Sequence, residues 1–143
     1  MQAFRLLFIT SLFLLASCSK DDGGSIANQY WSCNHKLGLD SASAHARLLG
    51  KWRYDRSYDA SGHEHKMSVN QDVMFNDDGT YSLFVNDQIS SSGRWRIKIF
   101  KDMPQIVSEP AIPELYTAPY FCGDEMMFSY SHVDGADFLL RRR

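Results

Sequence analysis

The chain has 143 residues and a formal net charge of -2 at pH 7, which is enough length for one domain with one core. The mild acidity gives no electrostatic footprint for nucleic acid, so we expect no nucleic-acid partner. Aromatic residues make up 13% of the chain and charged residues only 22%, which favours a packed domain over a disordered one.

Residues 1–17 have the pattern of a signal peptide. Arg5 is followed by an apolar run from Leu6 to Leu15, too short for a spanning helix, which needs roughly 20 apolar residues. The ending Leu15-Ala16-Ser17-Cys18 resembles the lipobox of bacterial lipoproteins. That resemblance implies that Cys18 carries the lipid, begins the mature chain and anchors it in a membrane. The alternative is an ordinary secretory signal that happens to end near a cysteine.

Residues 18–40 form the lipidated cysteine, a tether and a segment tied to the domain. Ser19-Lys20-Asp21-Asp22 resembles the surface-export tag of lipoproteins in one phylum of Gram-negative bacteria, which implies the outer membrane and the cell surface. A charged, solvated tether is the alternative. The small polar residues from Gly23 to Asn28 indicate a flexible spacer, and Tyr30-Trp31-Ser32-Cys33 indicates a segment held against the domain.

The cysteine count predicts one disulfide. With Cys18 lipidated, Cys33 and Cys122 remain as one pair in an oxidising compartment. A disulfide between them would close a loop of about 90 residues and would stabilise the folded state by about 4 kcal/mol in the chain-entropy model. The competing interpretation is a reactive thiol next to His35.

The segment from residue 41 to the C-terminus is predicted to form one short helix followed by strands. Ser41 to Leu49 is the only convincing helical stretch, with Ser41 or Ser43 as N-cap and Gly50 as its end. Beyond it the hydrophobic period is two, which predicts about eight antiparallel strands. We expect them near residues 50–59, 63–67, 73–75, 81–85, 94–99, 106–107, 115–116, 125–131 and 137–142, with turns at 61–62, 76–80, 86–87 and 134–135. Ser92-Gly93 leads into the strand at 94–99.

Gly50-Lys51-Trp52 after a short helix resembles the Gly-X-Trp that opens the barrel of lipocalins and their calycin relatives. In that family a basic residue on the final strand packs over the tryptophan, and here Arg141 or Arg142 stands in that place. The resemblance covers residues 41–143. It implies an all-β fold, a small antiparallel up-and-down β-barrel of about eight strands with a short N-terminal helix, closed by Gly50, Trp52 and Arg141.

A barrel of eight strands is either filled by its own side chains or wide enough for one small ligand. Buried tyrosine hydroxyls need partners, so the inward tyrosines would orient a polar group of that ligand. A plain packed core is the alternative. The expected ligand-binding residues are Trp52, Tyr54, Tyr58, Phe75, Tyr81, Leu83, Trp95, Ile97, Phe128 and Tyr130.

Metal and catalytic chemistry find little support in the sequence. His63 and His65 share one face of a strand and would bind a transition metal with a third ligand such as His132, but a solvated pair is the commoner case. No nucleophile elbow, zinc-protease helix or phosphate loop is present. We expect no metal, no cofactor and no enzymatic activity.

Two functions remain open. The first is a lipid-anchored barrel that binds a small apolar or amphipathic ligand at the cell surface. The second is a solid barrel that binds a protein partner, either as a subunit of a surface complex or as a protease inhibitor. In the inhibitor, the segment from Tyr30 to Leu37 would enter the protease cleft.

Overall fold

The computed structural model describes residues 26–130, 133 and 135–143. The predicted signal peptide, Cys18, the export tag and His132 therefore lie outside the described residues. The expected turn at 134–135 lies partly outside them.

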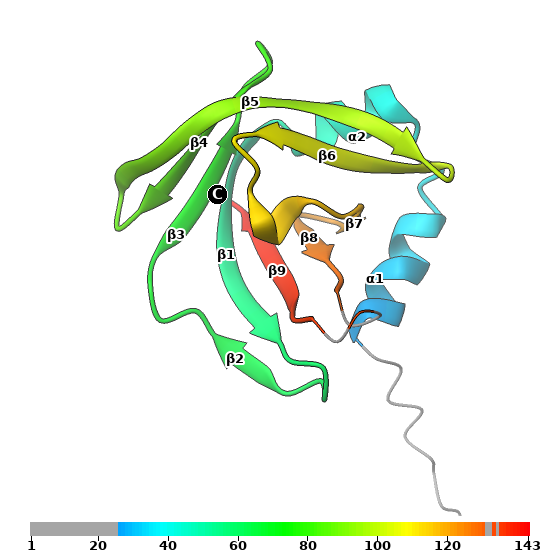
Figure 1. Ribbon diagram of the computed structural model, residues 1–143. Coiled ribbons are helices and arrows are strands. Elements are labelled where there is room, and N and C mark those ends of the chain that lie inside the picture. Colours follow the sequence, from blue (N-terminus) through cyan, green and yellow to red (C-terminus); the bar gives the residue numbers. More distant parts are fainter. Residues whose placement is uncertain (1–25, 131–132, 134) are drawn as a thin grey trace, which may run out of the picture.

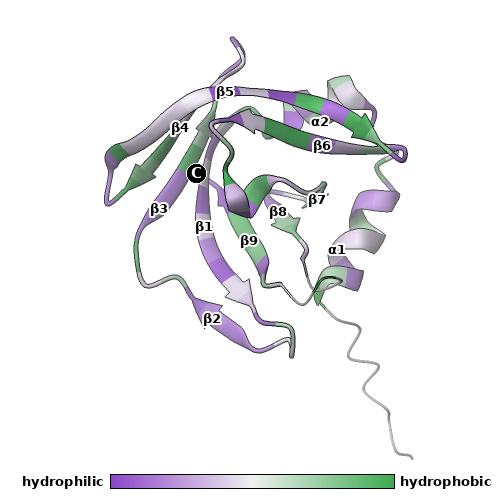
Figure 2. Cartoon of the chain, in the orientation of Figure 1, coloured by the Kyte–Doolittle hydropathy of each residue, from purple (hydrophilic) through white to green (hydrophobic). Residues whose placement is uncertain are grey.

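Eight strands pair antiparallel in the order β6-β5-β4-β3-β1-β9-β8-β7 and curl into a nearly closed barrel (Figure 1). This confirms the predicted all-β antiparallel up-and-down barrel. A further short strand, β2, pairs with the second half of β1 and is polar throughout (Figure 2). The strands are β1 (Gly50–Tyr58), β2 (Glu64–Lys66), β3 (Gln71–Phe75), β4 (Thr80–Val85), β5 (Gln88–Phe100), β6 (Met103–Glu109), β7 (Pro119–Cys122), β8 (Glu125–Phe128) and β9 (Asp137–Arg142).

The first and last strands of the barrel pair with each other, which leaves β6 and β7 as the two edges. Residues 110–118, here called the closing segment, connect these edges and cross between them in Figure 1. Residues 115–116 were predicted to form a strand, but the segment carries the 3₁₀ turn η1 (Pro113–Leu115) instead. Proline fixes φ and lacks an N–H, and so favours such a turn over a strand. The strand β7 that follows was not predicted.

The strand expected at 94–99 is longer than predicted, because residues 92–93, which were expected to precede it, lie inside the long strand β5. Gly93 is opposite Tyr81 of β4, and a side chain on it would overlap the carbonyl of Glu109 at the end of β6. The glycine therefore allows a close backbone approach within the sheet.

Two helices precede the barrel. The predicted helix is present as α2 (Ser41–Leu48), but its N-cap is Asp40, whose carboxylate accepts the N–H of Ser43 at 2.8 Å. Helix α1 (Ile26–His35) was not predicted: part of it was expected to be a flexible spacer. Neither helix of the described residues is long and apolar enough to cross a membrane.

The core fills the inside of the barrel and is covered by α2 and the closing segment. Leu48 of α2 is fully buried, and His45 stacks on Trp95 with ring centroids 4.7 Å apart. Ile112 and Leu115 of the closing segment are each 1% exposed and belong to the same core cluster as Trp52 and Phe75. The chain itself therefore occupies much of the barrel interior.

Candidate functional site

The barrel closes around Trp52, one of the three residues that were expected to close it. Its side chain is fully buried, and its indole N–H donates to the carbonyl of Leu48 at 2.7 Å. The guanidinium of Arg142 lies 4.4 Å from the ring centroid and donates to the carbonyls of Leu49 and Arg47 at the end of α2. Gly50 has φ +106°, and a Cβ there would lie 3.2 Å from Arg142 Nη1.

The arginine over Trp52 is Arg142 and not Arg141, because side chains alternate along β9. Leu140 and Arg142 face the inside, whereas Arg141 faces outward. There Arg141 Nε lies 2.8 Å from Glu125 Oε1 and 3.3 Å from Asp55 Oδ2. The prediction that Arg141 closes the barrel is therefore corrected by one residue.

Nine of the ten expected ligand-binding residues lie in or against the core cluster. Leu83 and Ile97 are partly buried and pack against it. The other seven are at most 5% exposed and form part of it: Trp52, Tyr54, Phe75, Tyr81, Trp95, Phe128 and Tyr130.

Tyr58 is the exception, because it lies on the outer face of the barrel. A bulge at Asp55 interrupts the pairing of β1 with β9, and one extra residue reverses the faces of all residues beyond it. Tyr58 consequently packs with Tyr30 of α1, Met127 and Leu139 in a second cluster. The expectation that it lines the interior is wrong.

Two of the inward tyrosines hold the closing segment. Tyr81 Oη donates to the carbonyl of Pro110 at 2.7 Å. Tyr130 Oη accepts the N–H of Tyr116 at 3.1 Å and donates to the carbonyl of Pro113 at 3.3 Å. These hydroxyls were expected to orient a ligand, and in the structure they bind the chain's own backbone.

The Tyr54 hydroxyl has no hydrogen-bond partner among the described residues, although the side chain is only 2% exposed. Its ring packs edge-on against the ring of Phe138, with the ring centroids 6.4 Å apart. Burial is the main cause that raises the pKa of Tyr54 well above its ordinary value, and the nearby Glu114 and Tyr130 raise it further. The group therefore stays a neutral hydroxyl that can both donate and accept a hydrogen bond.

Tyr54 also contributes to an open groove of about 540 Å³ where β1 and β3 part. β3 pairs with β1 only as far as Arg53, and the chain between β2 and β3 spans the remaining gap. The lining combines apolar and charged groups: Arg53, Tyr54, Asp55, Arg56, Glu64, Lys66, Met67, Val69 and Asn70. Met67 packs against the core, so one side of the groove is apolar.

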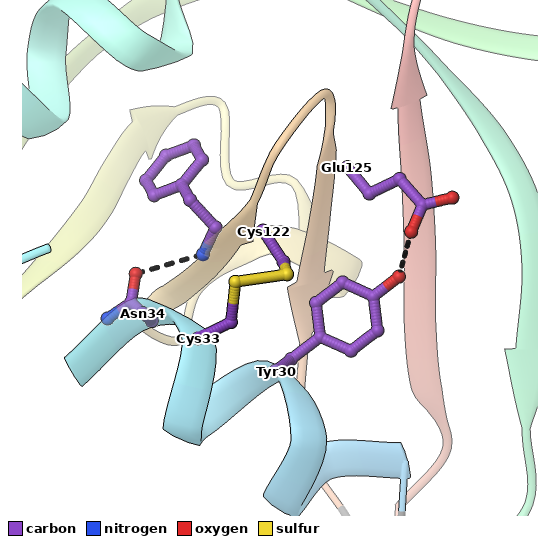
Figure 3. The surroundings of a disulfide bond; sticks show 6 residues. Tyr30, Cys33, Asn34, Cys122 and Glu125 are labelled. Carbon is purple, nitrogen blue, oxygen red and sulfur yellow. Dashed lines mark hydrogen bonds between the residues drawn. A yellow bond between two sulfur atoms is a disulfide. The ribbon is translucent and has the colours of Figure 1, made fainter. Parts of the chain in front are cut away.

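The predicted disulfide between Cys33 and Cys122 is present, with their Cα atoms 5.5 Å apart (Figure 3). It joins α1 to β7. One residue further along, Asn34 Oδ1 accepts the N–H of Phe121 at 2.9 Å. Tyr30 donates to the carboxylate of Glu125, and its pKa is raised by burial and by this hydrogen bond. Helix α1 thus covers an edge strand of the barrel, and Cys33 is not a free thiol.

The histidine pair is organised by a carboxylate. His63 Nδ1 and His65 Nε2 lie 3.5 and 3.1 Å from Asp59 Oδ2. The hydrogen bond from the His65 ring, followed by that from the backbone N–H of His63, lowers the pKa of Asp59 to about 2. No group of three or more metal-ligating side chains occurs in the part of the chain that the structure describes. The third ligand considered, His132, lies outside it.

Sequence reasoning missed two parts of this region, the closing segment and the groove. Pro110 and Pro113 signalled that residues 110–118 were irregular, but nothing local signalled that Ile112 and Leu115 would enter the core. The groove depends on where two strands separate, which only the pairing register decides.

No family model, curated protein or solved structure matches this chain.

Proposed function

We propose that this chain is a lipid-anchored envelope protein whose lipocalin-like barrel binds a small amphipathic ligand beside Tyr54. The anchor is the diacylglycerol on Cys18, with the export tag directing the protein to the cell surface. No cofactor or catalytic step is involved.

The buried, unpartnered hydroxyl of Tyr54 is the observation that carries the proposal. Leaving such a group without a hydrogen bond costs about 1–3 kcal/mol, and a polar ligand atom would remove that cost. The hydroxyls of the inward tyrosines Tyr81 and Tyr130 are already bonded to the closing segment. Thr117 Oγ1, also buried without a partner among the described residues, belongs to the closing segment itself. Among the inward tyrosines, Tyr54 is therefore the one whose hydroxyl is available to orient a ligand.

The groove beside Tyr54 supports an amphipathic ligand over a purely apolar one. Met67 and Val69 offer apolar contact, whereas Arg53, Arg56 and Lys66 bring three cations to two carboxylates of the same lining. A molecule with a short apolar part and an acidic or polar head matches that combination.

Native mass spectrometry tests this proposal. The full chain, purified in mild detergent and incubated with a total lipid extract of a bacterial envelope, is expected to carry a discrete extra mass that denaturation releases. Tyr54→Phe should lose most of this occupancy. Tyr120→Phe should keep it, since Tyr120 packs in the second cluster on the outer face and does not line the groove. A clean apo mass for the wild type, or equal occupancy in both variants, would contradict ligand binding at Tyr54.

A solid barrel that binds a protein partner is the second candidate. It is favoured by the dense interior, where Ile112 and Leu115 of the closing segment and seven of the expected ligand-binding side chains pack at 5% exposure or less. The protease-cleft version receives no support, because the segment from Tyr30 to His35 is helical and fixed to β7 through Cys33. If native mass spectrometry finds no bound ligand, the result would favour a subunit of a surface complex over a ligand-binding protein.

A further inference from the structure

Large apolar side chains gather where the second half of α1 meets the tip of the β5–β6 hairpin. Among the residues that the structure describes, eleven such side chains are exposed, and four of them lie here with exposures from 37% to 50%. Single exposed apolar residues are common, whereas a contiguous group marks an interaction surface. The four residues, called the hairpin-tip patch, are Trp31, Leu37, Phe100 and Met103.

The patch is one surface although its residues come from distant parts of the sequence. Trp31 and Met103 line the same shallow groove of about 160 Å³, together with Gly38, which follows Leu37. Met103 pairs with Phe100 across the hairpin. Figure 1 shows the tip of the β5–β6 hairpin beside the chain that leaves α1.

Cationic side chains surround the patch. Lys36, Lys98 and Lys101 are all exposed, and Lys101 Nζ lies 5.5 Å from the centre of the Phe100 ring. One carboxylate, that of Asp102, lies in the same turn. Tryptophan, aliphatic side chains and lysines together are typical of a surface that lies in the interface of an anionic membrane.

The position of the patch relative to the lipid attachment point fits the same partner. The described chain begins at Ile26, eight residues after Cys18, a stretch that spans at most about 28 Å in any conformation. Trp31 follows five residues later, about 8 Å along α1. An anchor at Cys18 would therefore keep the patch within reach of the lipid surface.

We propose that the hairpin-tip patch docks on the anionic lipid surface in which Cys18 is anchored. The proposal rests on the lipid anchor of the proposed function. Docking gives the barrel a fixed orientation on the membrane, with Trp31 and Phe100 at the level of the headgroups and the lysines paired with lipid phosphates.

Tryptophan fluorescence tests the docking directly. The chain has three tryptophans; Trp52 and Trp95 are 0% and 4% exposed, whereas Trp31 is 50% exposed. Trp31 is therefore the one that quenchers reach. The full lipidated chain is reconstituted on vesicles of phosphatidylcholine and phosphatidylglycerol with brominated acyl chains. Brominated lipid should quench the emission and aqueous iodide should not, and Trp31→Phe should abolish the lipid quenching.

Matched variants on two hairpins separate the patch from general adhesion. The double variant Phe100→Ser with Met103→Ser retains Trp31 and should lose the quenching by brominated lipid. The control is Val85→Ser with Ile89→Ser, which changes two exposed apolar residues at the β4–β5 hairpin. This control should be quenched like the wild type. Equal quenching in both double variants would overturn the role of the patch.

Vesicle flotation of the same samples, with Cys18→Ser beside them, separates the docking from the anchor. A chain that floats through Cys18 while iodide still quenches Trp31 overturns the docking and leaves the anchor intact. If Trp31 is shielded from both quenchers, a protein or a second copy covers the patch, and the lipid proposal is overturned. A wild-type chain that fails to float overturns both the anchor and the docking.

Discussion

The tyrosines of this barrel have different roles because their hydroxyls meet different surroundings. Tyr81 and Tyr130 bind backbone carbonyls of the closing segment, whereas the Tyr54 hydroxyl is buried with no partner among the described residues. A hydrogen bond contributes about 1 kcal/mol to stability, and a buried group without one costs more than that. The same residue type is thus stabilising at two positions and unfavourable at the third.

Removing single hydroxyls should separate these roles in the ligand-free protein. We expect Tyr54→Phe to leave the free energy of unfolding unchanged or raise it by about 1 kcal/mol, and Tyr81→Phe to lower it by about 1–2 kcal/mol. Urea unfolding followed by circular dichroism measures both values. An equal loss of stability in the two variants would show that the Tyr54 hydroxyl is bonded in the apo protein.

At the scale of elements, α1 protects an edge of the barrel. Strand β7 is an edge, and edge strands expose N–H and C=O groups that invite pairing with other chains. Asn34 satisfies the N–H of Phe121, and Cys33 fixes the helix one residue away in sequence from that contact. The disulfide therefore links helix α1, near the start of the described residues, to a strand that comes 89 residues later in the sequence.

Removing this disulfide should destabilise the domain strongly. The two cysteines are 89 residues apart, for which the chain-entropy model gives about 4 kcal/mol. The double variant Cys33→Ala with Cys122→Ala should therefore unfold at a much lower urea concentration. Reducing agent should shift the wild type to the same midpoint and leave the double variant unaffected. A wild type that does not respond to reduction, once free thiols are confirmed, would contradict this role.

At the scale of the whole molecule, the C-terminal strand closes the barrel onto its beginning. β9 pairs with β1 over most of its length. Arg142 then joins Trp52 to the end of α2, and Arg143 Nη1 lies 3.0 Å from the buried carboxylate of Asp72 on β3. The last two residues thus contact three elements that come early in the sequence.

Neighbouring arginines on β9 provide the test of this closure. Arg142→Gln removes the contact with Trp52 and two hydrogen bonds to α2 carbonyls, and we expect a loss of about 2 kcal/mol in unfolding free energy. Arg141→Gln removes ion pairs of a side chain that is 47% exposed, and should cost about 0.5 kcal/mol. Chemical denaturation of both variants provides the comparison, and the reverse order of the two losses would contradict the assignment of Arg142.

The sequence predicted the barrel because its signals are local. Alternating apolar residues marked most of the strands, Asp78-Gly79 marked the β3–β4 turn, and Gly50-Lys51-Trp52 marked the start of β1. The disulfide was predicted as well, since the expectation that Cys18 carries a lipid left only one pairing open. The ten residues expected to bind a ligand were mostly placed in the right core, but their contacts were not predictable.

Several outcomes depended on partners that are distant in sequence. The bulge at Asp55 arises from pairing with β9 and turns Tyr58 to the outer face. Strand β7 and helix α1 have weak local patterns, and they are held by each other through Cys33, Cys122 and Asn34.

By itself the sequence determined the all-β class, the short helix before the barrel and the aromatic core, because hydrophobic period and turn residues act over a few positions. Only the tertiary structure decided which arginine covers Trp52 and which side of the barrel Tyr58 faces. It also decided that Ile112 and Leu115 fill the interior and that the Tyr54 hydroxyl stays without a partner. Those outcomes depend on strand register and long-range packing, where a shift of one residue exchanges the inside of the barrel for the outside.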